Sequence, residues 1–162
     1  MEKEFGEIYN SHHQKVYRLC MGYFKGNTSL ADEVSQEVFI KIWEKLRSFR
    51  GESEISTWIY RITVNTCLMH IRSANKKKEV HLEFVPDSVE ENPEGEKEEQ
   101  LKMLYSCIYK LNELNRISIL MVLEGVPYER IAEVTGLSED TLRVRIHRIK
   151  KSLTQCVKKI NG

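Results

Sequence analysis

Residues 127–153, PYERIAEVTGLSEDTLRVRIHRIKKSL, decide the fold of the C-terminal part of this chain. Pro127 suits the first turn of a helix, Gly136 suits the end of that helix, and Ser138 suits the N-cap of the next. A turn of about three or four residues therefore separates the two helices. This pattern predicts a helix-turn-helix, whose second helix, over about 139–157, can lie in the major groove of duplex DNA.

The helix predicted over 139–157 has an apolar stripe and a basic face. At about 100° per residue, one narrow stripe collects the apolar side chains, which indicates a core-facing surface. The stripe consists of Leu142, Ile146, Ile149 and Leu153, and the opposite face of Arg143, Val144, His147, Arg148 and Lys151. Because arginine bidentate to guanine is the commonest specific base contact, the basic face fits a major groove, and Arg145, nearer the packed edge, suits a phosphate. The alternative is an ordinary amphipathic helix whose cations favour its C-terminal end.

Charge is distributed unevenly along the 162 residues, although the formal net charge is only +1. Counting Lys and Arg against Asp and Glu gives +5 for residues 61–78, −8 for 79–100 and +5 for 137–162. Such clusters are often no more than solvated surface. Two separated basic blocks, each at the end of a helical pattern, fit a long polyanion better than a small acidic substrate.

The acidic segment 79–100 divides the chain. It contains Pro86 and Pro93 and has little apolar periodicity, which is typical of an extended, self-repelling linker. We therefore expect two domains, residues 1–78 and 101–162, joined by a flexible acidic linker. Neither half can bury a large core, which favours small helical bundles that dock onto larger partners.

The expected fold class is all-α, with a three-helix N-terminal module and a four-helix C-terminal module that contains the helix-turn-helix. The segment 56–75 is rich in β-branched residues and would allow a strand by propensity, but its length of about 20 residues favours a helix. The expected helices lie at about 5–23, 29–47, 56–75, 101–111, 117–123, 127–134 and 139–157.

The helix expected over 29–47 carries an acidic strip with an apolar residue in its middle. The strip consists of Glu33, Gln36, Glu37, Ile40 and Glu44. Solvated surface is the usual explanation of such a strip. An apolar side chain among carboxylates also fits a partner that carries cations.

A third candidate site begins before the helix expected over 56–75 and follows it. Aromatic rings interleaved with cations and small polar groups suit unstacked single-stranded bases, although any single aromatic residue here could equally be core. The members are Arg50, Gly51, Ser53, Ser56, Thr57, Trp58, Tyr60, Arg61, Asn65 and Arg72, followed by Lys76, Lys77 and Lys78.

The four cysteines lie 47, 40 and 49 residues apart, at positions 20, 67, 107 and 156. The sequence has no CxxC spacing and no histidine at ligand spacing beside them. We therefore expect no metal site and no disulfide framework, but small core residues in a reducing compartment.

Enzymatic activity and membrane insertion are both disfavoured. A GxxxxGK[ST] loop, an HExxH motif and a Ser-His-Asp candidate set are absent, so we expect neither catalysis nor a cofactor. No run of about 18 apolar residues occurs, and the first residues, MEKE, lack a basic then apolar leader. We expect a cytoplasmic protein without stable membrane insertion.

The ordered set of motifs resembles the extracytoplasmic-function group of bacterial RNA polymerase sigma factors. The motifs are FxxIYxxHHxxVYRLCxGY (5–23), ADEVSQEVFIKIW (31–43), SFRGESEISTWIYRITVN (48–65) and LEGVPYERIAEVTGLSEDTLRVRIHRIKKSL (123–153). They cover both modules and leave out the acidic linker and the last few residues.

The resemblance implies a role for each site. The acidic strip would dock on the clamp helices of the largest subunit of core RNA polymerase. The loop from Phe49 to Ser56 and the start of the next helix would capture an extruded base of the −10 promoter element. The helix from Glu139 would read the −35 element, with Ser138 and Thr141 added to its basic face. The family also implies an anti-sigma factor as partner.

This sequence departs from the family pattern in two places. The acidic pair Asp32-Glu33 is reversed relative to the usual order, which preserves its charge. Trp58-Ile59 stands where housekeeping relatives have paired tryptophans, which implies reduced strand separation and less tolerance of promoter variation.

Two other functions remain open at this level. A stand-alone repressor or activator could use the same helix-turn-helix, and would bind palindromic duplex DNA without polymerase. An interaction-only regulator, such as an inhibitor of another sigma factor, would explain the acidic strip but leave both basic blocks without a role.

Overall fold

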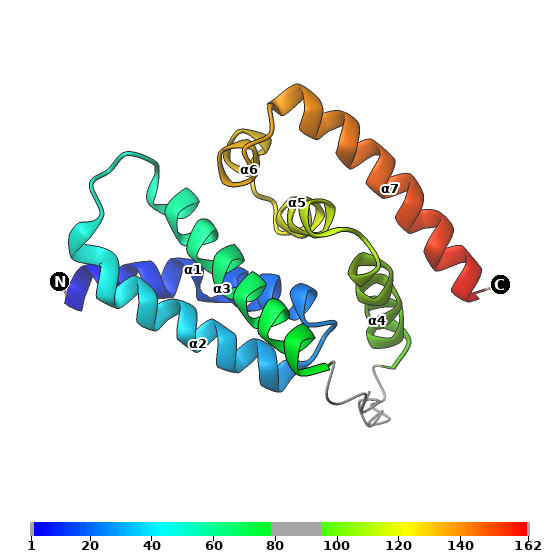
Figure 1. Cartoon of the computed structure of the whole chain (residues 1–162), viewed down its shortest axis with the longest axis horizontal. Coiled ribbons are helices and arrows are strands. Elements are labelled where there is room, and N and C mark those ends of the chain that lie inside the picture. The colour runs from blue at the N-terminus through cyan, green and yellow to red at the C-terminus, as the bar shows by residue number, and fades with distance from the viewer. Residues whose placement is uncertain (1, 79–94, 162) are drawn as a thin grey trace.

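The computed structural model describes residues 2–78 and 95–161, which form seven α-helices and one short 3-10 helix, with no strand in these two ranges (Figure 1). This confirms the all-α fold class. The helices are α1 (Glu2–Tyr23), α2 (Thr28–Lys45), η1 (Leu46–Ser48), α3 (Ile55–Lys78), α4 (Gly95–Tyr109), α5 (Glu113–Leu123), α6 (Tyr128–Thr135) and α7 (Glu139–Asn161). Within the described chain no helix combines the length and the apolar character needed to cross a membrane.

The first three helices form one bundle in which α1, α2 and α3 all contact one another. The turn between α1 and α2 contains Gly26 with φ 82°, and the side chain of Asn27 then accepts a hydrogen bond from the backbone N–H of Leu30 at 3.1 Å. A left-handed glycine followed by a capping asparagine ends one helix and starts the next. The core of this bundle includes Val16, Leu19, Val34, Ile42 and Ile59, each fully buried.

Two helices of the C-terminal half begin earlier than the apolar pattern indicates. α4 starts at Gly95 and not at Leu101, because the segment before Leu101 is rich in good helix formers with Glu96 and Glu98 in the first turn. The last part of the linker expected over 79–100 is therefore helical, from Gly95 onward. Its residues 79–94 lie outside the residues that the structure describes. α5 starts at Glu113 because Asn112 caps it, accepting a hydrogen bond from the N–H of Asn115 at 2.9 Å.

The helix-turn-helix has the caps that its sequence predicts. Gly136 ends α6 in the left-handed conformation, with φ 79°. The hydroxyl of Ser138 accepts a hydrogen bond from the N–H of Thr141 at 3.2 Å and so caps α7. The four residues of the apolar stripe, Leu142, Ile146, Ile149 and Leu153, are all buried, which confirms the predicted core face of α7.

Two of the four cysteines form a disulfide, which corrects the expectation that there is none. Cys107 of α4 and Cys156 of α7 form a disulfide whose Cα atoms lie 6.0 Å apart. Cys20 and Cys67 are free buried thiols, as expected, with their sulfurs 3.8 Å apart between α1 and α3. Spacing in the sequence does not reveal these pairs, because each joins two helices that only tertiary packing brings together.

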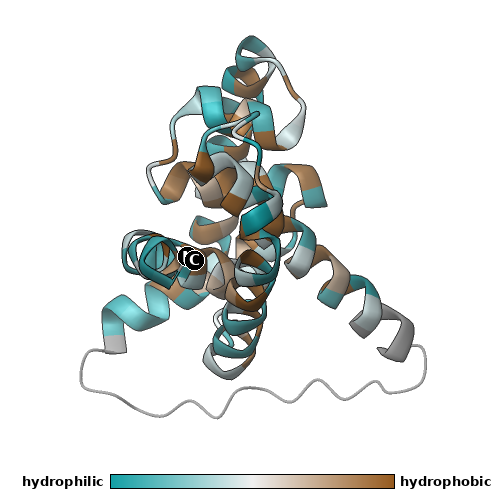
Figure 2. Ribbon diagram, turned by 90° about the vertical axis from the view of Figure 1, so that its left-hand side faces the viewer, coloured by the Kyte–Doolittle hydropathy of each residue, from teal (hydrophilic) through white to brown (hydrophobic). Residues whose placement is uncertain are grey.

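The two halves pack against each other. α4 and α5 contact α1, and α6 contacts α3, while α7 lies on the outer side of α4 and α5 (Figure 1). Figure 2 shows apolar residues gathered where helices face one another and polar residues on the outer faces. Leu120 of α5 lies directly against the backbone of Gly22 in α1, and Arg18 pairs with Glu124 at 2.6 Å.

Gly22→Ala is expected to destabilise the protein by about 1–3 kcal/mol, because the added Cβ would overlap the Leu120 side chain and force it to move. Urea unfolding measures this change. The matched control is Gly6→Ala in the same helix, where a Cβ meets nothing within 4 Å and no loss is expected. Equal stability of the two variants would contradict the observed packing of α1 on α5.

Candidate nucleic-acid and polymerase interfaces

The basic face of α7 points to solvent. Val144 is 52% exposed, and Arg143, His147, Arg148 and Lys151 are exposed around it. The buried stripe on the opposite side fixes this orientation. An apolar side chain surrounded by cations on an exposed helix can meet both base edges and phosphates of a duplex.

Acidic residues at the start of α7 hold one of these arginines. The guanidinium of Arg143 lies 3.7 Å from the carboxylate of Glu139 and 3.5 Å from that of Asp140. Both carboxylates are in the first turn, where the helix dipole favours them. The two pairs orient Arg143 toward the N-terminal end of α7, which is the part of a recognition helix that contacts bases.

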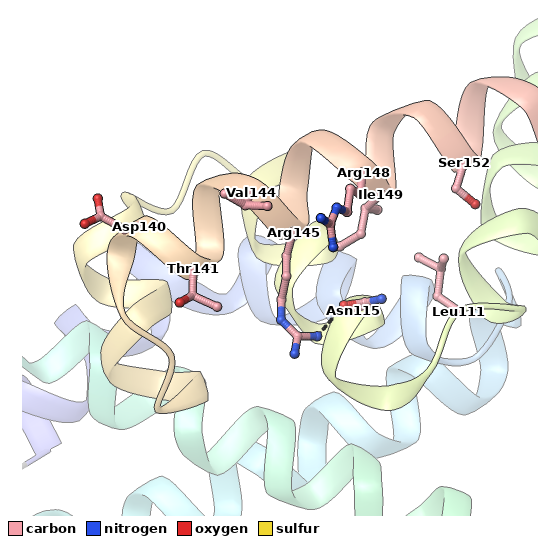
Figure 3. Close-up of a pocket in the computed structure, with 9 residues that line it drawn as sticks. All are labelled: Leu111, Asn115, Asp140, Thr141, Val144, Arg145, Arg148, Ile149 and Ser152. Atoms are coloured by element: carbon pink, nitrogen blue, oxygen red, sulfur yellow. Dashed lines mark hydrogen bonds between the residues drawn. The ribbon is translucent and has the colours of Figure 1, made fainter.

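Arg145 has different surroundings from the other cations of α7. It is half-buried, and its Nη1 donates a hydrogen bond to Oδ1 of Asn115 on α5 at 3.2 Å. Figure 3 shows this side chain extending from α7 toward α5. An open pocket of about 700 Å³ lies beside this hydrogen bond. It is lined by Leu111, Asn115, Asp140, Thr141, Val144, Arg145, Arg148, Ile149 and Ser152.

Asn115 was not among the residues singled out from the sequence. An asparagine in the first turn of a helix gives no functional signal by itself, and its contact with Arg145 depends on the crossing of α5 and α7. The hydrogen bond holds the Arg145 guanidinium at the side of the basic face, where a phosphate of the DNA backbone fits better than a base edge.

Four members of the acidic strip are exposed on α2, and the fifth is partly covered by α3. Glu33, Gln36, Ile40 and Glu44 are exposed, with Ile40 58% exposed. Glu37 is half-buried, and its carboxylate accepts a hydrogen bond from Nε2 of His70 in α3 at 2.6 Å. The strip that is open to a partner is therefore smaller than the sequence suggests.

The Glu37 carboxylate has a perturbed pKa. The hydrogen bond from His70 lowers its pKa most, partial burial raises the pKa, and the nearby charges of His70 and Lys41 lower it further. Lys41 Nζ lies 3.6 Å from the carboxylate and also donates to the hydroxyl of Thr66 at 3.2 Å. Glu37 is thus part of the α2–α3 packing in this structure.

Exposed aromatic rings extend the surface around Ile40. Trp43, one turn further along α2, is 39% exposed, and Tyr9 of α1 is 44% exposed. Phe5 connects them, with its ring centroid 5.1 Å from that of Trp43 and 6.5 Å from that of Tyr9. The part of this extension on Tyr9 depends on the packing of α1 against α2, which the pattern of a single helix does not reveal.

The candidate single-strand site is only partly on the surface. Tyr60 is 3% exposed and Thr57 is fully buried, which corrects the expectation that they are available to bases. They are covered because α3 packs against α1 and α2 and also against α6. Trp58 is half-buried, and its ring contacts that of Phe49 at a centroid distance of 5.0 Å.

The remaining members surround the loop and the outer face of α3. Ser53 and Ser56 are half-buried. The exposed members are Arg50, Gly51, Arg61, Asn65 and Arg72. Gly51 has φ 72°, a left-handed conformation that glycine adopts without strain. Lys76, Lys77 and Lys78 end α3, but their side chains lie outside the described part of the structure.

Helix α6 covers the start of α3. Arg130 of α6 pairs with the carboxylate of Glu54, and its Nη1 donates to the hydroxyl of Ser56 at 2.9 Å. Arg61 Nη2 donates to the backbone carbonyl of Glu133 at 2.9 Å. Two members of the candidate single-strand site are thus bound by the C-terminal half of the same chain.

Metal ligation has no support in the residues that the structure describes, since no group of three or more His, Cys, Asp or Glu side chains converges there.

Comparisons with known proteins agree with the arrangement of the helices. Residues 8–77 match the family model of sigma-70 region 2, and residues 101–153 match that of sigma-70 region 4. The sequence is 31% identical to the ECF RNA polymerase sigma-E factor of Haemophilus influenzae, over 94% of this chain and 86% of that protein. It is 27% identical to the ECF RNA polymerase sigma factor SigW of Bacillus subtilis, over 92% and 86%.

Two solved structures share the fold. One is the sigma factor RpoE in complex with the anti-sigma factor NepR from Bartonella quintana, with a TM-score of 0.74 and 18% identity over 96% of this chain and 98% of that one. The other is CnrH in complex with the cytosolic domain of CnrY, with a TM-score of 0.75 and 21% identity over 98% and 90%.

The Glu37 pair is expected to make stability depend on pH. Because folding lowers the Glu37 pKa, its contribution is present above the unfolded-state pKa of about 4.3 and is lost as pH falls through the lower folded-state value. The free energy of unfolding of wild type minus that of Glu37→Gln should be positive at pH 6, below about 1 kcal/mol for this solvent-screened pair, and should decrease as the pH falls from about 5 toward 3.

Urea unfolding of both proteins across this pH range measures the difference. Glu44→Gln, at an exposed carboxylate of the same helix, is the control and should show a smaller dependence. A Glu37→Gln difference that stays constant down to pH 3 would contradict the role of the carboxylate charge.

Proposed function

The chain belongs to the extracytoplasmic-function group of RNA polymerase sigma factors, and from this membership we propose that it recruits core polymerase to promoters by reading the −35 and −10 elements with its two halves. The observation that carries the proposal is the exposed basic face of α7 behind a correctly capped helix-turn-helix.

The −35 element is assigned to α7. Arg143, Val144, His147 and Arg148 face outward in its N-terminal half and would meet base edges in the major groove. Lys151 and Arg145 lie at the end and the side of this face and would contact phosphates. Thr141 is exposed in the first turn, and Ser138, whose hydroxyl caps the helix, precedes it.

The −10 element is assigned to the loop before α3 and to the outer face of that helix. An extruded base costs a few kcal/mol in lost stacking, which a pocket and phosphate contacts must offset. Phe49 and Trp58 supply rings at the loop, and Arg61, Asn65 and Arg72 supply polar contacts along α3.

Core polymerase is assigned to the exposed part of α2. Glu33, Gln36 and Glu44 surround Ile40, which gives an apolar centre with an acidic rim. An interface of this composition suits a partner that carries cations, as the clamp helices of the largest subunit would. Trp43 and Tyr9 enlarge its apolar part.

In this assignment the chain makes and breaks no covalent bond and needs no cofactor. Its binding energy holds polymerase on the promoter and keeps the strands apart, while polymerase synthesises RNA. It would act in the cytoplasm, where chromosome and polymerase are found. An anti-sigma factor is the expected regulator, as the two structural neighbours were solved with NepR and with the cytosolic domain of CnrY.

Transcription in vitro with purified core polymerase and a promoter library tests the proposal. Transcripts should start at a subset of sequences that share two spaced elements. Ile40→Ala combined with Glu33→Ala is the docking variant and should reduce transcription by lowering polymerase affinity. A stand-alone repressor would instead bind palindromic duplex without polymerase and support no initiation.

Arg148→Ala and Lys151→Ala are expected to act differently on −35 duplex binding. Arg148→Ala should relax base preference at one position, because a base contact is lost, at a cost of about 1–3 kcal/mol. Lys151→Ala should weaken all sequences alike and reduce the log–log salt slope by about 0.9, because a phosphate contact is lost. Binding to matched and mismatched duplexes at several salt concentrations separates these effects, and equal losses for both variants would contradict the assignment.

Arg130→Ala is expected to increase the affinity of the free chain for a single-stranded −10 oligonucleotide, because the release of Ser56 and the start of α3 from α6 outweighs the loss of one cation and of the ionic partner of Glu54. Fluorescence anisotropy with the oligonucleotide measures the change. Glu129→Ala, at the exposed neighbouring position of α6, is the control and should leave this affinity unchanged. Unchanged binding by Arg130→Ala would show that the contact of α6 with α3 does not restrict the −10 site.

A further inference from the structure

The disulfide between Cys107 and Cys156 joins the first helix of the C-terminal half to its last helix. Their separation is 49 residues, so the bond closes a loop that contains α5, α6 and most of α7. Disulfides in the cytoplasm, where the proposed function places this chain, are usually transient and redox-sensing. A disulfide at this place therefore needs an explanation beyond simple stabilisation.

The bond lies on the helix that carries the −35 face. Arg143 to Lys151 occupy the first half of α7, and Leu153 is the last residue of its buried stripe. Beyond Leu153, Cys156 and Val157 are half-buried while their neighbours Gln155 and Lys158 are exposed. The disulfide thus anchors the outer half of α7 to α4, beyond the stripe that holds its first half.

The two cysteine pairs differ in their access to solvent. In the disulfide, Cys107 is 2% exposed but Cys156 is half-buried near the end of α7, whereas Cys20 and Cys67 are both 0% exposed within the N-terminal bundle. The hydrogen bond with Cys20 and burial both raise the pKa of the Cys67 thiol, which keeps it protonated. Since the thiolate is the reactive species, the N-terminal pair is protected from exchange.

The basic end of α7 also favours an anionic exchange partner. Lys159 follows Cys156 by about one helical turn and is exposed, as is its neighbour Lys158. Small cellular thiols of the glutathione class carry a net negative charge. A basic helix end would raise their local concentration.

We propose that Cys107 and Cys156 form a reversible thiol–disulfide site that couples −35 binding to the redox state of an anionic small thiol. On oxidation, the two thiols lose two protons and two electrons to a disulfide of that small thiol, which leaves as two thiol molecules. On reduction, the same bonds exchange in reverse through a mixed disulfide. The proposal rests on the proposed function of α7.

The oxidised form is the one with tighter DNA binding. A crosslink across a long loop lowers the conformational entropy of the unfolded chain. Because the C-terminal half has only a small core, this crosslink supplies a large share of its stability. It also ties the outer half of α7 to α4, so less conformational entropy is lost when the helix binds. The reduced form keeps the buried stripe but loses the anchor of the outer half of α7.

The experiment uses the full chain equilibrated in buffers with different ratios of reduced to oxidised glutathione. Trapping with a maleimide of high mass counts the free thiols, and anisotropy with a −35 duplex gives Kd in the same buffers. We expect two thiols to disappear and return reversibly while Cys20 and Cys67 remain free, and the oxidised chain to bind the duplex about threefold or more tightly.

Cys156→Ala should show the same Kd in oxidising and reducing buffers, close to that of the reduced wild type. Cys20→Ala is the matched control and should keep the redox dependence. The comparison of oxidised with reduced wild type needs no variant, so the test survives a variant that fails to fold.

Three results would overturn the proposal: no disulfide at any glutathione ratio, a bond that reducing buffer does not open, or equal Kd in both states. Transcription with core polymerase in reducing buffer is measured separately. If transcripts form in reducing buffer but the redox state changes neither the thiols nor Kd, this inference is rejected and the sigma-factor function stands. If initiation fails in both redox states, the sigma-factor function itself is rejected.

Discussion

The basic face of α7 depends on the burial of the apolar stripe on the other side of the same helix. Once Leu142, Ile146 and Ile149 are buried against the neighbouring helices, the period of the helix leaves the cations on the opposite, exposed side. Gly136 and Ser138 set where this helix begins, so they determine which residues stand at its N-terminal end. The DNA-binding face is therefore a consequence of core packing and capping.

The packing of the two halves uses side chains that the proposed function also needs. Ser56 and Arg61 would serve the −10 site, yet here they bind Arg130 and the backbone of Glu133. Under the proposed function, single-stranded DNA and α6 would therefore compete for the start of α3.

On α2, Glu37 belongs to the acidic strip and also accepts a hydrogen bond from His70 of α3. This carboxylate of the acidic strip links α2 to α3, so Ile40 and its exposed neighbours form the most open part of the strip. The two cysteine pairs have similar positions in the two halves. Cys20 and Cys67 lie on α1 and α3, and Cys107 and Cys156 lie on α4 and α7, the first and last helix of each half. Their burial differs, since Cys156 is half-buried and the other three cysteines are buried.

The sequence by itself determined the all-α class, the helix-turn-helix and the basic face of α7, because helical period, caps and turn residues act within a few positions of one another. The early starts of α4 and α5 were missed because acidic first turns and an asparagine cap extend helices beyond their apolar pattern. Only the tertiary structure decided that Tyr60 is buried, that Asn115 holds Arg145, and that Cys107 bonds to Cys156. These contacts join residues on different helices, and a single sequence carries no record of how its helices cross.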